Sequence, residues 1–308
     1  AGLLSALVLT AGCAAAPGPP GQSDIEVATG VDASFAPVFL AQQKGMFAEA
    51  GLNVKVTQFA QGNEGIDAVL SGSGANIALS GDAAAISRAG RDQLRAIAVF
   101  QESGEYVKLV ARSGITDATG VKRFGVTRGS LNEYATLQLL GHYDVPTESV
   151  EFVQANPPEM TGLLHQRDID GFVLWEPWPT QAVRDGATVL AKSQDWDYSF
   201  TQLILSRQDW LAGHADAVKT FLGVMKKADQ MVQDDPAAAA AAVHQALPNI
   251  TEDQALANIK EITYQVRPFD DRDRANFTSI RDFLVAKGVL KTTPDINVFA
   301  TNEWNPTP

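Results

Sequence analysis

The sequence predicts an α/β protein that is divided into two lobes with mostly parallel sheets. Short apolar runs typical of strands alternate with helical patterns along most of the chain, and this alternation favours parallel strands. Two segments, 25–56 and 124–153, share one order: a strand, a small polar loop, a helix, a turn and a second strand. A chain of 308 residues is also long enough to divide into two lobes.

The predicted strands are short runs rich in apolar and β-branched residues. They are Ile25–Thr29, Val54–Phe59, Asn76–Leu79, Leu94–Phe100, Tyr106–Arg112, Arg123–Thr127, Val150–Gln154, Gly171–Leu174, Thr188–Leu190 and Phe200–Ser206. After about Gln208 the pattern changes to helices only. These helices are Ala215–Gln233, Pro236–Ala246, Glu252–Tyr264 and Asp271–Lys287.

The beginning of the chain predicts export. The apolar run Leu3–Thr10 is much shorter than the roughly 20 residues of a spanning helix, so residues 1–12 are interpreted as part of a secretion signal. The segment Leu9-Thr10-Ala11-Gly12-Cys13 resembles the lipobox of bacterial lipoproteins, which implies a lipid on Cys13 and an extracytoplasmic, membrane-anchored protein. An ordinary signal peptide that contains a Cys is the alternative. Residues 13–23 are rich in Pro and Gly and predict a spacer.

Composition argues against several classes of function. The net charge of −12 disfavours a nucleic-acid partner. The four His show no metal-ligand spacing and the single Cys allows no disulfide framework, so we expect no metal and no cofactor. No nucleophile elbow, P-loop or paired-His motif is present, and we therefore expect a binding protein and not an enzyme.

Four motifs occur in a specific order along the chain. They are Gln43–Phe47 with Glu49–Val54, Gly65–Gly72 with Asn76–Asp82, Gly125–Ser130, and Ile169–Pro177. Together they resemble the periplasmic binding proteins for nitrate, sulfonate, taurine and thiamine-pyrimidine precursors, although Asn76 stands where an acidic residue is usual. The resemblance implies the type II periplasmic-binding-protein fold, in which two lobes joined by two crossing strands hold a ligand between them.

The resemblance also implies a domain organisation and partners. Lobe 1 is expected at 24–111 plus 204–308, and lobe 2 at 112–203, with crossings near Leu109–Gly114 and Thr201–Ser206. The family's members capture a small solute and deliver it to the permease of an ATP-driven importer. We expect this chain to do so as a monomer.

Ligands of such sheets bind beyond the carboxyl ends of the strands, where helix N-termini favour anionic groups. In the second lobe the clearest loop is Thr127–Ser130. Arg128 can form paired hydrogen bonds to an oxyanion, Gly129 allows close approach of the backbone, and Ser130 offers a hydroxyl. The alternative is a helix cap with a solvent-exposed Arg.

The other candidates follow further strands in both lobes. They are Ser34, Phe35, Gly62, Asn63, Ser80, Gly81 and Asp82 in the first lobe, and Asn156, Trp175 and Glu176 in the second. Asp82 is expected either to cap a helix or to face a ligand ammonium, and Trp175 either to line the site or to pack in the lobe core. Glu102, Glu105 and Tyr106 follow another strand and are additional candidates.

The predicted ligand is a small organic anion such as a sulfonate or taurine. Asp82 and Glu176 leave room for a cationic second end. The alternative ligand is a pyrimidine-type solute stacked on Phe35 or Trp175. A fungal enzyme that resembles this family makes thiamine pyrimidine and uses a Cys-rich motif. This chain has no Cys after Cys13, so the enzyme is the less favoured alternative.

Overall fold

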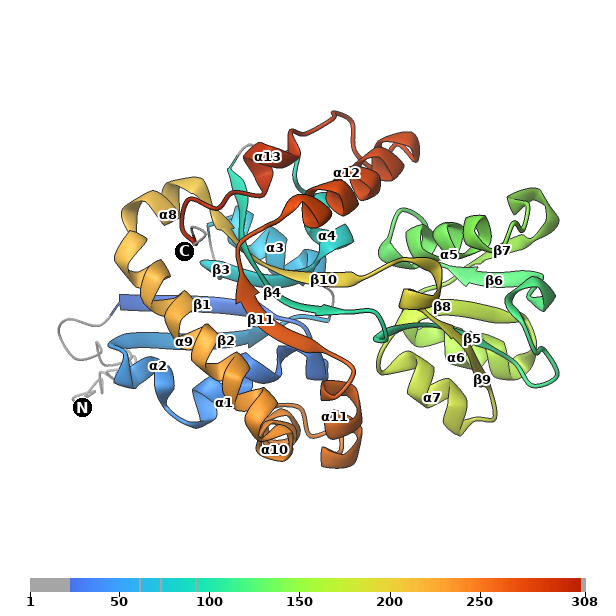
Figure 1. Cartoon of the computed structure of the whole chain (residues 1–308), viewed down its shortest axis with the longest axis horizontal. Helices are drawn as coiled ribbons and strands as arrows, with labels where there is room; N and C mark the ends of the chain where they lie inside the picture. Colours follow the sequence, from blue (N-terminus) through green and yellow to red (C-terminus); the bar gives the residue numbers. More distant parts are fainter. Residues whose placement is uncertain (1–22, 61, 73, 92, 306–308) are drawn as a thin grey trace, which may run out of the picture.

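The computed structural model describes residues 23–60, 62–72, 74–91 and 93–305, and these residues form two α/β lobes that lie side by side (Figure 1). Lobe 1 is built on a six-stranded sheet in the order β11-β4-β10-β3-β1-β2, and lobe 2 on a five-stranded sheet in the order β7-β6-β8-β5-β9. The expected signal segment 1–12 and Cys13 lie outside the described residues. Ser23, expected in the spacer, is the first residue of β1.

The strands confirm the ten predicted from the sequence, with small shifts at their ends. In lobe 1 they are β1 (Ser23–Thr29), β2 (Leu52–Gln58), β3 (Ile77–Gly81), β4 (Leu94–Ser103), β10 (Phe200–Arg207) and β11 (Thr263–Arg267). In lobe 2 they are β5 (Val107–Ala111), β6 (Arg123–Val126), β7 (Glu151–Gln154), β8 (Gly171–Trp175) and β9 (Thr188–Lys192). The central strand β10 is buried over almost its whole length, whereas the edge strand β2 contains mainly half-buried and exposed residues.

Both sheets are mixed, which corrects the expectation of mostly parallel sheets. Strands β2, β1 and β3 run parallel, as do β7, β6 and β8. In contrast, β4, β10 and β11 in lobe 1 and β5 and β9 in lobe 2 pair antiparallel with their neighbours. Strands that lead out of a lobe and back into it run in opposite directions, and an apolar run in the sequence does not reveal its direction.

Helices cover both faces of each sheet. One face of lobe 1 carries α1 (Ala36–Gln43), α2 (Met46–Glu49), α9 (Ala215–Asp234), α10 (Pro236–Ala246) and α11 (Glu252–Ile259). Its other face carries α3 (Gly62–Leu70), α4 (Asp82–Ile86), α8 (Gln208–Gly213), α12 (Asp271–Ala286) and α13 (Ile296–Phe299). In lobe 2, α5 (Leu131–His142) covers one face, and α6 (Pro157–Gln166) and α7 (Trp178–Arg184) cover the other (Figure 1).

The chain crosses between the lobes at positions that differ from the expected ones. Residues 107–111 form β5 inside the smaller sheet, so the first crossing is at 104–106 and not near Leu109–Gly114. Residues 200–207 form β10 inside the larger sheet, so the second crossing is at 193–199. The expected lobe boundaries at 111 and 203 shift accordingly. The physical reason is that both runs are apolar, and only the pairing decides which sheet an apolar run joins.

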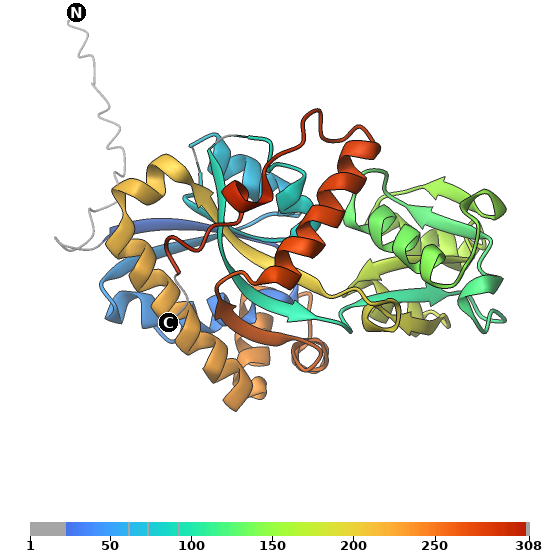
Figure 2. The same ribbon diagram turned by 45° about the horizontal axis from the view of Figure 1, so that its top comes forward.

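One strand lies in the part of the chain expected to be helical only. The predicted helix Glu252–Tyr264 ends at Ile259, and Thr263–Arg267 forms β11 at the edge of the larger sheet. Tyr264 and Val266 are buried and their neighbours are exposed, which is the period of two of a strand. In Figure 2 the helix that follows β11, α12, extends from lobe 1 toward lobe 2.

Among the described residues, the structure contains no helix with the length and apolar character that crossing a membrane requires.

Candidate functional site

The loop after β1 joins lobe 1 to the first crossing. Asp32 accepts hydrogen bonds at Oδ1 from the backbone N–H of Ser34 at 2.9 Å, from the Ser34 hydroxyl at 2.5 Å and from the Tyr106 hydroxyl at 2.9 Å. Burial raises the pKa of Asp32, and the three donors oppose this increase. The candidate Ser34 is completely buried. Gln202 of β10 donates a hydrogen bond to its hydroxyl at 2.8 Å.

The candidate Phe35 lies in the core of lobe 1 and not on an open surface. Its side chain is only 3% exposed, and its ring stacks on Phe100 with centroids 6.2 Å apart. A Cβ added at Gly30 would lie 2.6 Å from this ring. The aromatic faces needed to stack a heterocycle are thus already covered.

Two candidates on neighbouring elements, Gly62 and Ser80, are brought into contact. A Cβ at Gly62 would lie 2.3 Å from Ser80 Oγ, so only glycine allows α3 to begin this close to β3. The hydroxyl of Ser80 is buried without a hydrogen-bond partner among the described residues. Asn63 lies beside them on α3 and is half-buried, and Gly81 packs against the Phe200 ring.

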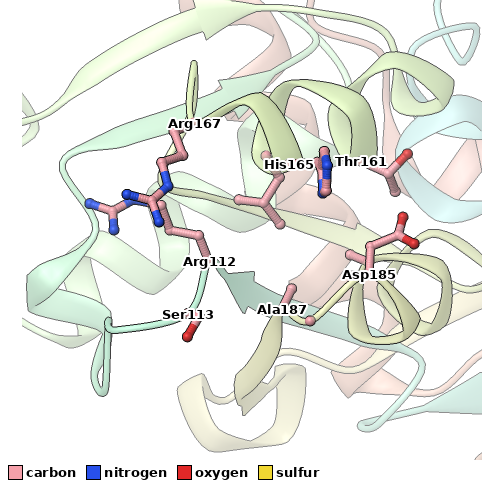
Figure 3. Close-up of a pocket in the computed structure, with 10 residues that line it drawn as sticks. Arg112, Ser113, Thr161, His165, Arg167, Asp185 and Ala187 are labelled. Atoms are coloured by element: carbon pink, nitrogen blue, oxygen red, sulfur yellow. The ribbon is translucent and has the colours of Figure 1, made fainter.

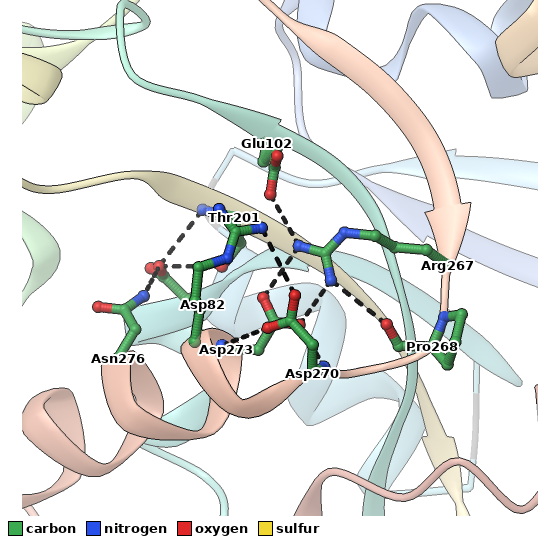
Figure 4. A network of polar contacts seen from close by, with 9 residues as sticks. Asp82, Glu102, Thr201, Arg267, Pro268, Asp270, Asp273 and Asn276 are labelled. Carbon is green, nitrogen blue, oxygen red and sulfur yellow. Dashed lines mark hydrogen bonds and ion pairs between the residues drawn. The ribbon is translucent and has the colours of Figure 1, made fainter. Parts of the chain in front are cut away.

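Asp82, at the start of α4, is the centre of a buried polar network (Figure 4). Its carboxylate accepts from the Tyr198 hydroxyl at 3.2 Å and from both the backbone and the hydroxyl of Thr201. The Asn276 side chain of α12 donates at 3.4 Å. Burial raises the pKa of Asp82 to about 6 despite these donors. Asp82 is the first residue of α4 and Gly81 occupies the N-cap position, so the expected capping role is wrong. Its completely buried carboxylate instead joins the second crossing to α12.

The same view contains a second network, around Arg267 (Figure 4). The guanidinium donates to both oxygens of Asp273 at 2.5 and 3.0 Å and to Glu102 of β4 at 2.7 Å. Asp273 also accepts from the backbone N–H of Asp270, which caps α12. These bonds fix the start of α12 against the end of the larger sheet.

The loop expected to hold an anion lies at the start of α5 in lobe 2. The Ser130 hydroxyl accepts from Asn132 N–H at 3.1 Å and donates to the Thr127 carbonyl at 2.6 Å, so it caps the helix. Gly129 has φ +70°, and a Cβ there would lie 2.5 Å from Val289 Cγ2 of lobe 1. Arg128 is exposed, and no ion pair of its guanidinium occurs within the described residues.

Gly129 also serves the contact between the two lobes. The space next to its α-carbon is filled by Val289 of the other lobe, so this glycine allows contact between the lobes. Arg128 is the charged side chain of the loop that remains available to a solute.

The candidate Glu176 lies in an ion-pair cluster between the lobes. Lys108 of β5 contacts Glu176 at 2.5 Å within lobe 2 and Glu261 of lobe 1 at 2.6 Å. The Lys108 and Glu176 side chains are 6% and 2% exposed. Burial raises the pKa of Glu261, and Lys108 opposes this increase.

Trp175 is half-buried beside Glu176 and packs against both apolar cores. Asn156 is exposed at the start of α6, and its backbone donates to Glu159.

Contacts on the opposite side also join the lobes. The Tyr134 hydroxyl of α5 lies 3.1 Å from the Ser279 hydroxyl of α12, and Glu133 pairs with Lys287 at 3.0 Å. The Tyr134 ring also packs edge-on against Phe283. The strand ends of the two lobes are thus flanked by two groups of contacts, one at Lys108 and one at α12.

Sequence reasoning missed several polar residues of this region. They are Asp32, Gln101, Lys108, Tyr198, Gln202 and Glu261. Asp32 lies in the short loop that follows β1, and a polar residue in a loop after a strand is a signal that the sequence contains. Gln101, Lys108 and Gln202 lie inside apolar runs, where a polar residue at a buried position is the only sequence signal.

Two cavities in the described part of the chain lie near the strand ends that are remote from the crossings. A pocket of about 210 Å³ opens on lobe 2 between α6 and α7, with Arg112, His165, Arg167 and Asp185 at its wall (Figure 3). Another, of about 280 Å³, lies on lobe 1 beside Arg207 and Trp210. No cluster of metal-ligating side chains occurs among the residues described.

Comparisons with known proteins agree with this architecture. A model of the NMT1-like family matches residues 18–247. The chain is 26% identical over 242 residues to a Bacillus subtilis (strain 168) protein named putative aliphatic sulfonates-binding protein, covering 73% of this chain and 71% of the relative. It is also 26% identical over 203 residues to the taurine-binding periplasmic protein of Escherichia coli (strain K12), and this match covers 64% of this chain and 63% of the relative.

A solved structure confirms the fold. The periplasmic aliphatic sulphonate binding protein of Escherichia coli superposes with a TM-score of 0.81, at 13% identity, over 90% of this chain and 97% of that chain. The expected periplasmic-binding-protein fold is therefore confirmed.

Proposed function

The chain belongs to the NMT1-like family, and from this we propose that it is an extracytoplasmic solute-binding protein of an ATP-driven importer. It captures a small organic anion, sulfonate-like or taurine-like, between its two lobes. The observation that carries the proposal is the gathering of polar side chains at the strand ends of both lobes, next to the two crossings. The names of the two relatives, which bind sulfonates and taurine, support this class of solute.

The geometry supports capture by closure of the lobes. The crossings at 104–106 and 193–199 are short, and a hinge needs changes in only a few backbone angles. The anionic group is placed at the start of α5, where the helix dipole favours negative charge. Arg128 adds a full positive charge at that position, and its guanidinium has no protein partner among the described residues.

We also propose that a lipid on Cys13 keeps the protein at the membrane and that the loaded protein delivers its solute to a permease. Residues 13–22 then form a spacer between membrane and lobes. Membrane fractionation of cells that express the full-length precursor tests the anchor, since a soluble mature protein would contradict it.

A pyrimidine-type solute is the second candidate. The half-buried Trp175 beside Glu176 favours it, because an aromatic side chain in that position provides a stacking surface. Phe35 no longer supports it, since its ring is covered by Phe100. A thermal-shift screen with sulfonates, taurine, nitrate and pyrimidines separates the candidates, because a bound solute raises the unfolding midpoint.

Arg128→Ala tests the anion site. We expect at least a tenfold loss of affinity for the sulfonate that binds best, because a charge-assisted hydrogen bond is lost. Isothermal titration calorimetry measures the change. Arg184→Ala is the matched control, since Arg184 is an exposed Arg at the end of α7 in the same lobe. Equal affinity of Arg128→Ala and wild type would remove Arg128 from the site.

A further inference from the structure

Four polar side chains form a cluster at the end of the larger sheet, which we call the amide cluster: Asp32, Ser34, Gln101 and Gln202. Gln101 and Gln202 are direct partners across the antiparallel strands β4 and β10, so their side chains lie on the same face. Gln202 Nε2 donates to Ser34 Oγ at 2.8 Å, and Ser34 in turn donates to Asp32 Oδ1. The cluster therefore connects the two central strands to the loop after β1.

The direction of these hydrogen bonds is fixed by chemistry. An ionised carboxylate only accepts, so the single hydroxyl proton of Ser34 is donated to Asp32. Ser34 can then only accept from Gln202, which directs the Gln202 amide nitrogen toward Ser34 and leaves its Oε1 as an acceptor. The cluster thus ends in acceptor oxygens at Gln202 and at Asp32.

Buried amide atoms of this cluster have no partner. Gln202 Oε1 and both Gln101 Oε1 and Nε2 are buried without a hydrogen bond among the described residues, and the two side chains belong to residues that are 4% and 1% exposed. A buried polar atom without a partner destabilises a fold, because it loses its hydrogen bonds to water and gains none in return. Such atoms at a strand end next to a hinge are explained if they contact a solute.

The negative charge of Asp32 also favours contact with a solute. Asp32 accepts only from Ser34 and Tyr106, and no Lys, Arg or His pairs with it in the described chain. The buried cation in this region, Lys108, is shared between Glu176 and Glu261. Asp32 is half-buried, and a partly buried carboxylate without a counter-charge favours a neighbouring cation. Tyr106, which covers Asp32, belongs to the first crossing, so a hinge motion changes what covers the cluster.

We propose that the captured solute carries an amino or ammonium group and that Asp32 and Gln202 Oε1 accept its N–H bonds, with the Gln101 amide beside them. The inference rests on the proposed function and specifies the class of solute: one that carries an amino group, as taurine and an aminopyrimidine do, and not a simple alkanesulfonate or nitrate. For an amino-substituted anion such as taurine, the amino end then contacts lobe 1 and the anionic end contacts lobe 2 at Arg128.

Two matched ligand pairs test the proposal by calorimetry with the full chain. The first pair is taurine and ethanesulfonate, which differ only in the amino group. The second is a 4-aminopyrimidine and the same pyrimidine without its amino group. We expect the amino member of at least one pair to bind tenfold or more tightly than its partner.

The outcomes separate this inference from the proposed function. Equal affinity within every pair that binds overturns the inference and leaves a binding function intact. A preference for the aminopyrimidine without binding of either sulfonate supports the amino contact and contradicts a sulfonate as the solute. Binding of neither pair contradicts both.

Variants locate the contact. Asp32→Asn is expected to lower affinity for the amino ligand at least tenfold, with little change for its partner that lacks the amino group. Asp24→Asn, an exposed carboxylate at the opposite end of the same strand, is the control and is expected to bind like wild type. Gln202→Met, which keeps the length but not the amide, is the second variant if Asp32→Asn unfolds. Full amino selectivity in a folded variant of either residue overturns the assignment.

Discussion

At the scale of single residues, burial decides what a polar side chain does. Ser130 and Asp82 were both expected either to cap a helix or to face the solute. Ser130 caps α5 with its hydroxyl. Asp82 is completely buried, where it joins the second crossing to α12 through Tyr198, Thr201 and Asn276. The residue type predicted a polar role in both cases, and the surrounding chain chose the partners.

Asp82 makes stability depend on pH in a defined direction. Its pKa is raised from 3.8 to about 6, chiefly by burial, so the folded state holds the proton more tightly than the unfolded state. The contribution therefore favours folding below about pH 4 and is lost as pH rises to about 6. The loss is on the order of 3 kcal/mol.

Asp82→Asn is expected to remove this contribution, because an amide does not titrate. Urea unfolding from pH 4 to 7 measures it as the difference between wild type and variant, since Asp32, Asp229 and Glu261 also have raised pKa values. Curves that stay parallel over this range would show that Asp82 does not titrate there.

At the scale of elements, periodicity predicted strands and helices well and their neighbours poorly. The helix α10 matches its predicted bounds, and all ten predicted strands are present. The strand β11 was missed, because the helical pattern that begins at Glu252 extends to Tyr264 and overlaps the start of this strand. Five residues can follow either period, and pairing with β4 selects the strand.

The β11–α12 corner depends on Arg267. Its side chain is 14% exposed and holds Asp273 and Glu102, so Arg267→Met leaves a buried carboxylate without its cation. We expect a loss of about 3 kcal/mol in the free energy of unfolding. Urea denaturation measures it.

Arg272→Met is the matched control for this prediction. Arg272, the second residue of α12, is 78% exposed and reaches Asp270 only at 3.5 Å, so its loss should change stability by less than about 1 kcal/mol. If both variants lose the same free energy, burial of the Arg267 network is not the reason.

At the scale of the whole molecule, polar contacts hold the two lobes together. The Lys108–Glu261 pair is largely buried, whereas the Lys287–Glu133 pair is more open, with Lys287 40% exposed. Buried pairs are screened less by salt and respond more strongly to the loss of one partner. The first pair is thus the stronger link.

Glu261→Gln is expected to favour a more open arrangement of the lobes, because Lys108 then keeps only Glu176, its partner within lobe 2. Small-angle X-ray scattering of the ligand-free protein should show a larger radius of gyration than wild type. Lys287→Gln is the comparison and should leave the radius unchanged. An identical radius for Glu261→Gln and wild type would show that this pair does not hold the lobes together.

Local sequence determined much of this protein by itself. It specified the α/β class, the ten strands and the order of motifs that mark the family, because side-chain periodicity and turn residues are encoded within short windows. It also placed the candidate loops at strand ends. Ser80 and Gly62 come together as strand-end neighbours for this reason.

Only the tertiary structure decided which side chains meet. Lys108 and Glu261 are far apart in the chain, and so are Ser34 and Gln202, and only the pairing of β4, β10 and β11 brings their elements together. The same pairing set the mixed sheets, the crossings and the missed strand. Hydrogen bonds between strands and the direction of each strand are relations between distant segments, and a single window of sequence carries neither.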